Sequence, residues 1–161
     1  MDTAYFELNF QPNVQLVSVV RRFVTEFYQQ FLNDPDGTSR VALATHELLE
    51  NAVKYSRDGE TTIRIEVSPH ATPRRVRIQL RNRAEPHDIA AIREIVDGVN
   101  QATDAIGFYQ TLIAAKAKTK TAASGLGLAR ICAEAEMKIH YDVQGDTLVI
   151  EASTVMMEGA Q

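Results

Sequence analysis

The sequence has one cysteine, no apolar run long enough to cross a membrane, and no excess of positive charge. Cys132 alone cannot form an internal disulfide, and a structural zinc site made of cysteines would need further thiols. We therefore expect Cys132 to be a small buried apolar residue. A membrane span needs about 18 consecutive apolar residues, and charges interrupt the longest apolar runs well before that length. A disulfide scaffold and a transmembrane protein are thus not expected.

The charge balance argues against nucleic acid as a partner. Lys and Arg number 17 and Asp and Glu 21, giving a formal net charge of -4, so no basic field attracts a polyanion. The first ten residues carry acidic groups where a signal peptide has basic ones. We expect a soluble, cytoplasmic protein with neither a nucleic-acid nor a membrane partner.

The composition is that of one globular domain. The chain has 161 residues, of which 45% are hydrophobic and 24% charged, which suits a single domain over residues 1–161. The tail from about residue 154 to 161 is expected to be flexible.

The periodicity of apolar residues predicts an alternation of strands and helices that is irregular. Alternating patterns predict strands at residues 5–10, 61–67, 74–80, 138–143 and 147–152. Spacings of three and four predict helices at residues 14–31, 39–55, 89–99, 104–117 and 125–135. Residues 33–37 read as a turn, and Ser39 and Asp88 as helix N-caps. This order favours an α+β fold, a two-layer α/β sandwich whose mixed, mostly antiparallel sheet carries helices on one face.

One face of the helix expected at 39–55 carries polar residues that suit chemistry. Glu47, Asn51 and Lys54 lie on successive turns. An amide oxygen and a carboxylate so placed suit a site where oxygen ligands hold a cation such as magnesium while the carboxylate accepts a proton. The alternative is an ordinary solvated face, in which Glu50 and Lys54 form a surface pair.

A second candidate motif is the glycine-bearing start of the last expected helix, residues 124–130 (SGLGLAR). Glycines let a phosphate approach the main chain, and a helix N-terminus supplies free amides. The motif is not a Walker loop because no Gly-Lys-Ser/Thr follows, nor a dinucleotide fingerprint because Arg130 replaces the third glycine. The alternative is a helix start with Ser124 as N-cap and glycines that permit close packing.

Together, residues 47–56 (ELLENAVKYS) and 125–131 (GLGLARI) resemble the N box and second glycine box of the GHKL ATPases, the superfamily of gyrase, histidine kinases and MutL. The resemblance covers nearly the whole chain and implies the Bergerat-type two-layer fold. In size the chain is similar to the small bacterial serine kinases of anti-sigma-factor type. Those kinases phosphorylate a small STAS-domain antagonist in partner-switching pathways and often pair. The resemblance thus implies a serine/threonine kinase dependent on ATP and Mg²⁺, a STAS-domain partner and a homodimer.

The resemblance also assigns roles to residues. Glu47 would accept the proton from the attacking hydroxyl, and Asn51 would coordinate the magnesium that bridges the ATP phosphates. Residues 101–124 would form the ATP lid, with a phosphate contact from Lys116, Lys118 or Lys120. The nucleotide-binding residues that it implies are Asn51, Lys54, Asn82, Ser124, Gly125, Leu126 and Gly127.

The first glycine box departs from the family pattern Asp-x-Gly-x-Gly. Asn82 stands at the position of the aspartate that meets the adenine amino group, and Ala84 and Pro86 replace the glycines. The side-chain oxygen of an asparagine can still accept a hydrogen bond from an amino group. The alternative for Asn82 is an Asx turn that closes the strand.

Three functions follow from these observations. The first is the kinase, favoured by the presence of both Glu47 and Asn51. The second is a GHKL-fold protein without nucleotide binding, acting as a protein-docking or phosphotransfer module, which the altered first glycine box favours. Phosphotransfer would need a reactive histidine on an exposed helix, whereas two of the four histidines are expected in loops and one in a strand. The third is a free-standing ATPase. Architecture alone does not choose among them.

Overall fold

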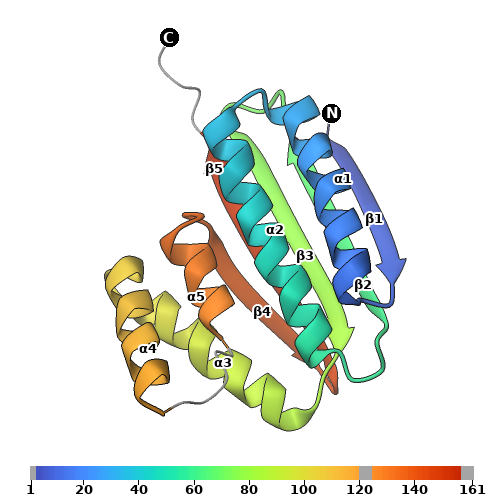
Figure 1. Ribbon diagram of the computed structural model, residues 1–161. Helices are drawn as coiled ribbons and strands as arrows, with labels where there is room; N and C mark the ends of the chain where they lie inside the picture. The colour runs from blue at the N-terminus through green and yellow to red at the C-terminus, as the bar shows by residue number, and fades with distance from the viewer. Residues whose placement is uncertain (1–2, 120–124, 157–161) are drawn as a thin grey trace.

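The computed structural model describes residues 3–119 and 125–156 (Figure 1). Its strands are β1 Ala4–Phe10, β2 Thr61–Ser68, β3 Arg74–Arg83, β4 Lys138–Gln144 and β5 Thr147–Met156. Its helices are α1 Val14–Leu32, α2 Pro35–Tyr55, α3 Pro86–Gln101, α4 Ala105–Thr119 and α5 Leu126–Ala133. None of the helices in this part of the chain has the length and apolarity that crossing a bilayer requires.

The strands form one sheet in the order β1-β2-β3-β5-β4, and every described pair of neighbours is antiparallel. Figure 1 shows the helices on one face of this sheet. The strand side chains alternate accordingly: on β2 and β3, Ile63, Ile65, Ile78 and Leu80 are fully buried beneath the helices. The expected α+β sandwich with helices on one face is therefore confirmed.

The core lies between the sheet and the two long helices. From α1, Val17, Val20 and Val24 are buried, and from α2 Leu48 and Leu49. This burial follows from the three- and four-residue spacing of apolar side chains, which puts them on the sheet-facing side of each helix. The core fixes the rotation of α2, and so determines which of its polar residues face the neighbouring helices.

The starts of two helices differ from the sequence expectation. The N-cap of α2 is Asp34, whose side chain accepts a hydrogen bond from the Gly37 amide at 3.1 Å. Pro35 occupies the first turn, which needs no amide donor from it. The expected turn at 33–37 therefore begins a helix, and Ser39 lies inside that helix. The N-cap of α3 is Glu85, without a side-chain cap bond, so Asp88 lies within the first turn.

Candidate functional site

Helix α2 presents Glu47 and Asn51 to its neighbours rather than to solvent. The Glu47 side chain is 13% exposed and Asn51 is 7% exposed, whereas Lys54 is exposed. A carboxylate and an amide are seldom buried on a helix face that only meets water. The solvated-face alternative is therefore wrong for Glu47 and Asn51, although it describes Lys54.

Asn51 carries an unpaired buried donor. Its Nδ2 has no hydrogen-bond partner within the described residues. Leaving a buried polar group unpaired costs about 1–3 kcal/mol of folding free energy; in the described residues Nδ1 of His46, Oγ of Ser56 and Oγ1 of Thr61 are unpaired in the same way. The role that the family resemblance gives to Asn51 uses the amide oxygen, which accepts rather than donates, so the unpaired Nδ2 does not bear on that role.

Helix α5 brings its glycine segment against Glu47. Oε1 of Glu47 accepts a hydrogen bond from Nη1 of Arg130 at 2.9 Å, and this contact is also an ion pair. A Cβ atom at Gly127 would collide with Oε2 of the same carboxylate. Glu47 and the second glycine box thus form one site, although they are far apart in the sequence.

Position 125 needs a glycine for a different structural reason from position 127. Gly125 occupies the N-cap position of α5 with φ +88°, in the left-handed region, and a Cβ there would lie 2.8 Å from Cγ1 of Ile95 on α3. The close-packing alternative for the glycines is therefore correct as a description of their contacts, because Gly125 admits α3 and Gly127 admits Glu47. Ser124 lies outside the described residues, and Leu126 begins α5.

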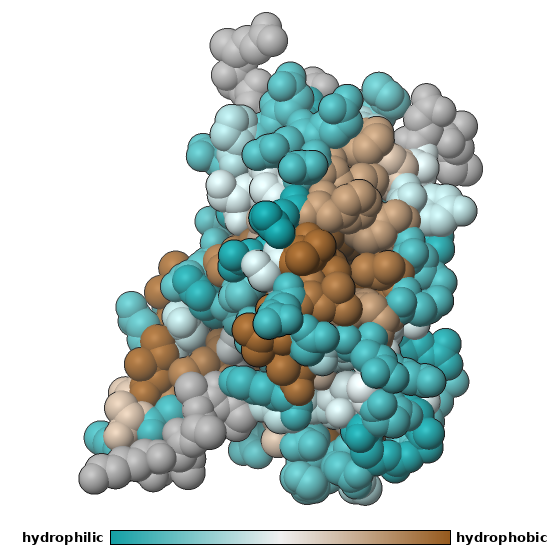
Figure 2. Space-filling model, turned by 45° about the vertical axis from the view of Figure 1, so that its right-hand side comes forward, coloured by the Kyte–Doolittle hydropathy of each residue, from teal (hydrophilic) through white to brown (hydrophobic). Residues whose placement is uncertain are grey.

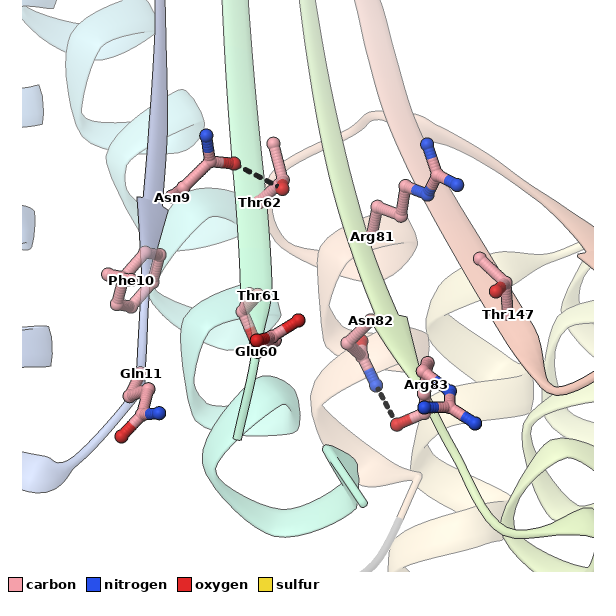
Figure 3. A pocket seen from close by; sticks show the side chains of 10 residues that line it. All are labelled: Asn9, Phe10, Gln11, Glu60, Thr61, Thr62, Arg81, Asn82, Arg83 and Thr147. Carbon is pink, nitrogen blue, oxygen red and sulfur yellow. Dashed lines mark hydrogen bonds between the residues drawn. The ribbon is translucent and has the colours of Figure 1, made fainter. Parts of the chain in front are cut away.

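Asn82 lies inside β3 rather than in a turn. Its Cα is paired with Thr61 of β2 and with Leu148 of β5, and it is 5% exposed. The Asx-turn alternative is therefore wrong. Nδ2 of Asn82 donates to the carbonyl oxygen of Arg83 at 3.1 Å, as Figure 3 shows. This bond fixes the amide orientation, and Oδ1 remains the group that can accept from an amino donor.

The two residues that replace the glycines of the first glycine box, Ala84 and Pro86, both have structural roles. Ala84 is fully buried, and its amide donates to the carbonyl oxygen of Asp146 at 2.9 Å. Pro86 begins α3. The carboxylate of Asp146 also binds Arg57 at 2.7 Å and Arg83 at 2.6 Å, and these arginines lower its pKa, Arg83 most. The ion pairs of Asp146 and the backbone bond from Ala84 therefore stabilise this end of the sheet.

A cavity of about 550 Å³ lies at the same end of the sheet (Figure 3). Its lining is mostly polar and comprises Asn9, Phe10, Gln11, Glu60, Thr61, Thr62, Arg81, Asn82, Arg83 and Thr147. Of the expected nucleotide-binding residues that the structure describes, Asn82 lines this cavity, whereas Asn51 and Gly127 do not, and neither does Glu47.

Arg130 is the site residue whose role the sequence did not reveal. Besides Glu47, it binds Glu134 one turn along α5, with Nε to Oε2 at 2.7 Å. The bond to Glu134 is the main cause of the raised pKa of Arg130, and the bond to Glu47 adds to it. The ion pair of Arg130 with Glu134 can be predicted from their four-residue spacing in the sequence. The contact of Arg130 with Glu47 depends on the tertiary structure and cannot.

The expected lid is largely helical. Helix α4 occupies Ala105–Thr119 and carries Lys116 and Lys118 in its last turn. Lys120 lies outside the described residues. Whether either described lysine contacts a phosphate stays a prediction.

The residues present fit magnesium and ATP in part. In the described part of the chain, no group of three or more His, Cys, Asp or Glu could hold a metal. Magnesium bound with a nucleotide typically uses only one or two protein ligands beside the phosphates. Asn51 alone can therefore supply the protein ligand that such a magnesium ion needs. Oδ1 of Asn82 can serve a nucleotide as an acceptor, because it is Nδ2 of that amide that donates to Arg83.

Comparison with known proteins identifies the family. Residues 10–151 match the histidine kinase-like ATPase domain family. The chain belongs to this family. Its fold is similar to a chain in "The crystal structure of SiaB-SiaC complex from Pseudomonas aeruginosa", with a TM-score of 0.63, 14% identity, and coverage of 94% of this chain and 89% of that chain. No curated protein sequence matches this histidine kinase-like domain.

Proposed function

We propose that this histidine kinase-like domain is a serine/threonine protein kinase dependent on Mg²⁺ and ATP, which regulates a small protein partner. The observation that carries the proposal is the contact of Glu47 with Gly127 and Arg130 of α5, one turn of α2 before the buried Asn51. The family match supports ATP binding.

In this proposal each site residue has a separate role in binding Mg-ATP or in the transfer of the phosphoryl group. Asn51 holds the magnesium through its amide oxygen, Asn82 accepts a hydrogen bond from the adenine amino group, and Glu47 accepts the proton of the substrate hydroxyl. Lys54 and the start of α5, including Leu126 and Gly127, lie beside the phosphates. Bound Mg-ATP supplies the phosphoryl group and the neutralising charge.

The partner that we propose is a small STAS-domain protein of a bacterial partner-switching pathway. The similar solved structure is a complex of two proteins, SiaB and SiaC, which supports a protein partner in general. The STAS class comes from the resemblance to anti-sigma-factor kinases alone.

Transfer of labelled phosphate from [γ-³²P]ATP to candidate STAS-domain proteins tests the proposal. We expect labelling of a serine or threonine that Glu47→Gln reduces about 100-fold or more, because a general base contributes roughly 10²–10⁴ in rate. Glu50→Gln, on the same helix, is the control and should retain labelling. Equal activity of the two variants would refute the assignment of Glu47.

The second candidate is a domain that does not bind nucleotide and acts by docking or phosphotransfer. The buried Ala84 and the pairing of Glu47 with Arg130 favour it. His87, expected in a loop, lies in the first turn of α3 with its side chain 81% exposed, so the structure gives phosphotransfer a candidate residue. Phosphorylation abolished by His87→Ala and retained in Glu47→Gln would favour this candidate.

We also propose that two copies of the chain pair through β1 and α1. Strand β1 is an edge of the sheet, and Val14, Val19 and Phe23 on α1 are more than half exposed. Figure 2, turned toward this side, shows apolar side chains gathered in its centre. Open edge strands and exposed apolar patches are common association sites. Light scattering should give a dimer that Phe23→Glu dissociates; a monomeric wild type would refute the pairing.

A further inference from the structure

Arg130 of α5 links two carboxylates, Glu47 of α2 and Glu134 at the C-cap of its own helix. Its Nη1 binds Oε1 of Glu47 at 2.9 Å, and its Nε binds Oε2 of Glu134 at 2.7 Å. Glu134 lies on the same helix as Arg130, so this bond holds the guanidinium from its own side. The guanidinium therefore has a second partner on its own side of the α2–α5 contact.

The link distinguishes the two oxygens of Glu47. Oε1 is occupied by Arg130, whereas Oε2 faces Gly127, where a Cβ atom would collide with it. The side chain of Glu47 is largely buried, with 13% exposed. Because Oε1 already shares a lone pair with Arg130, Oε2 is the oxygen that we assign to accept a proton from a substrate.

We propose that Arg130 is the positioning residue of the site, holding Glu47 so that Oε2 points toward the phosphate-binding start of α5. This inference rests on the proposed kinase function. In the transfer, the substrate hydroxyl gives its proton to Oε2 while its oxygen bonds to the transferred phosphoryl group, and ADP leaves with the electron pair of the broken bond. Arg130 touches neither substrate nor nucleotide.

The guanidinium group is suited to this task because its planar fork presents donors in fixed directions. A lysine would supply the charge to Glu47 without the second, oriented bond to Glu134. Arg130→Lys should therefore restore part of the function that Arg130→Gln loses.

The test measures rate, affinity and coupling separately. Arg130→Gln is expected to lower kcat of phosphotransfer about 100-fold, the loss typical of a misplaced catalytic group, while the Kd for Mg-ATP in calorimetry stays within about twofold. Arg130→Lys should recover about a tenth of the wild-type kcat. Equal losses in affinity and rate, or no recovery with lysine, would overturn the proposal.

Arg40→Gln is a matched control. Arg40 is 39% exposed against 40% for Arg130, and it also bridges from α2, to Glu136 at 3.3 Å. This variant should keep the wild-type kcat. A loss as large as that of Arg130→Gln would show a general effect of removing a long-range ion pair of α2, and would overturn the proposal.

A double-mutant cycle of Glu47→Gln and Arg130→Gln in thermal unfolding, without nucleotide, separates this inference from the proposed function. A clear coupling between the two positions is expected. Additive effects would overturn the proposal, whatever the activity. If the wild type neither binds Mg-ATP nor transfers phosphate, the proposed function fails, and the cycle still decides whether Arg130 holds Glu47.

Discussion

Asn51 combines burial with an unpaired amide, so its effect on stability should differ from that of an ordinary buried asparagine. Asn51→Ala removes the unpaired Nδ2, and the gain offsets the lost packing. We expect a Tm unchanged or raised by about 2–4 °C in calorimetry, the shift that roughly 1 kcal/mol gives for a domain of this size.

Asn100→Ala is the control for that prediction. Nδ2 of Asn100 on α3 donates to the carbonyl oxygen of Ile139 at 3.0 Å, so this variant loses a made hydrogen bond and should lower the Tm. If Asn51→Ala lowered the Tm as much as Asn100→Ala, Asn51 would be a structural residue.

Gly127 is the point where α5 admits the Glu47 carboxylate. Gly127→Ala adds a methyl group that displaces the flexible end of Glu47, while alanine favours the helix by about 1 kcal/mol. We expect stability close to that of the wild type and a loss of phosphotransfer of at least tenfold. A variant with wild-type activity would show that the position of Glu47 does not matter.

Cys132 is half-buried, and burial raises its pKa to about 11. At pH 8 the reactive thiolate is therefore scarce, and a disulfide reagent should modify the folded protein far more slowly than the protein in guanidinium chloride. Because the folded pKa lies above the unfolded value of 9.0, the corresponding stability is complete below pH 9 and is lost as the pH rises toward 11. Equal modification rates in both states would contradict the burial.

At the scale of elements, the stabilities of two variants compare Asp34, the N-cap of α2, with Asp88, which the sequence predicted as an N-cap. Asp34→Ala removes the acceptor of the Gly37 amide and should cost about 1 kcal/mol in urea unfolding. Asp88→Ala removes no cap bond, because Glu85 precedes α3. A larger loss in Asp88→Ala would show that the sequence expectation for α3 was right.

The elements themselves could largely be predicted from the sequence, because burial of one face imposes a period on the apolar residues. The strand at 74–80 was predicted too short, since Asn82 breaks the apolar alternation although it lies on the buried face of β3. The start of α2 was missed because proline, aspartate and glycine favour both a turn and a helix start.

At the scale of the whole molecule, the packing of α2 against α5 creates the site. The spacing of Glu47 and Asn51 placed them on one face, but the contacts of Glu47 with α5 are tertiary, and the sequence does not locate α5. The contacts of Glu47 with Gly127 and with Arg130, the latter across 83 positions, show that both motifs belong to one site. Such a contact has no periodic signal in a single sequence.

The central claim is that the α2–α5 site binds Mg-ATP, and calorimetric titration tests it most directly. Mg-ATP should bind the wild type and Asn100→Ala saturably, and Asn51→Ala, folded with an unchanged Tm, should lose this binding. ADP, tested in parallel, should bind more weakly, since it lacks the γ-phosphate. No heat and no thermal stabilisation of the wild type at millimolar Mg-ATP would contradict the account.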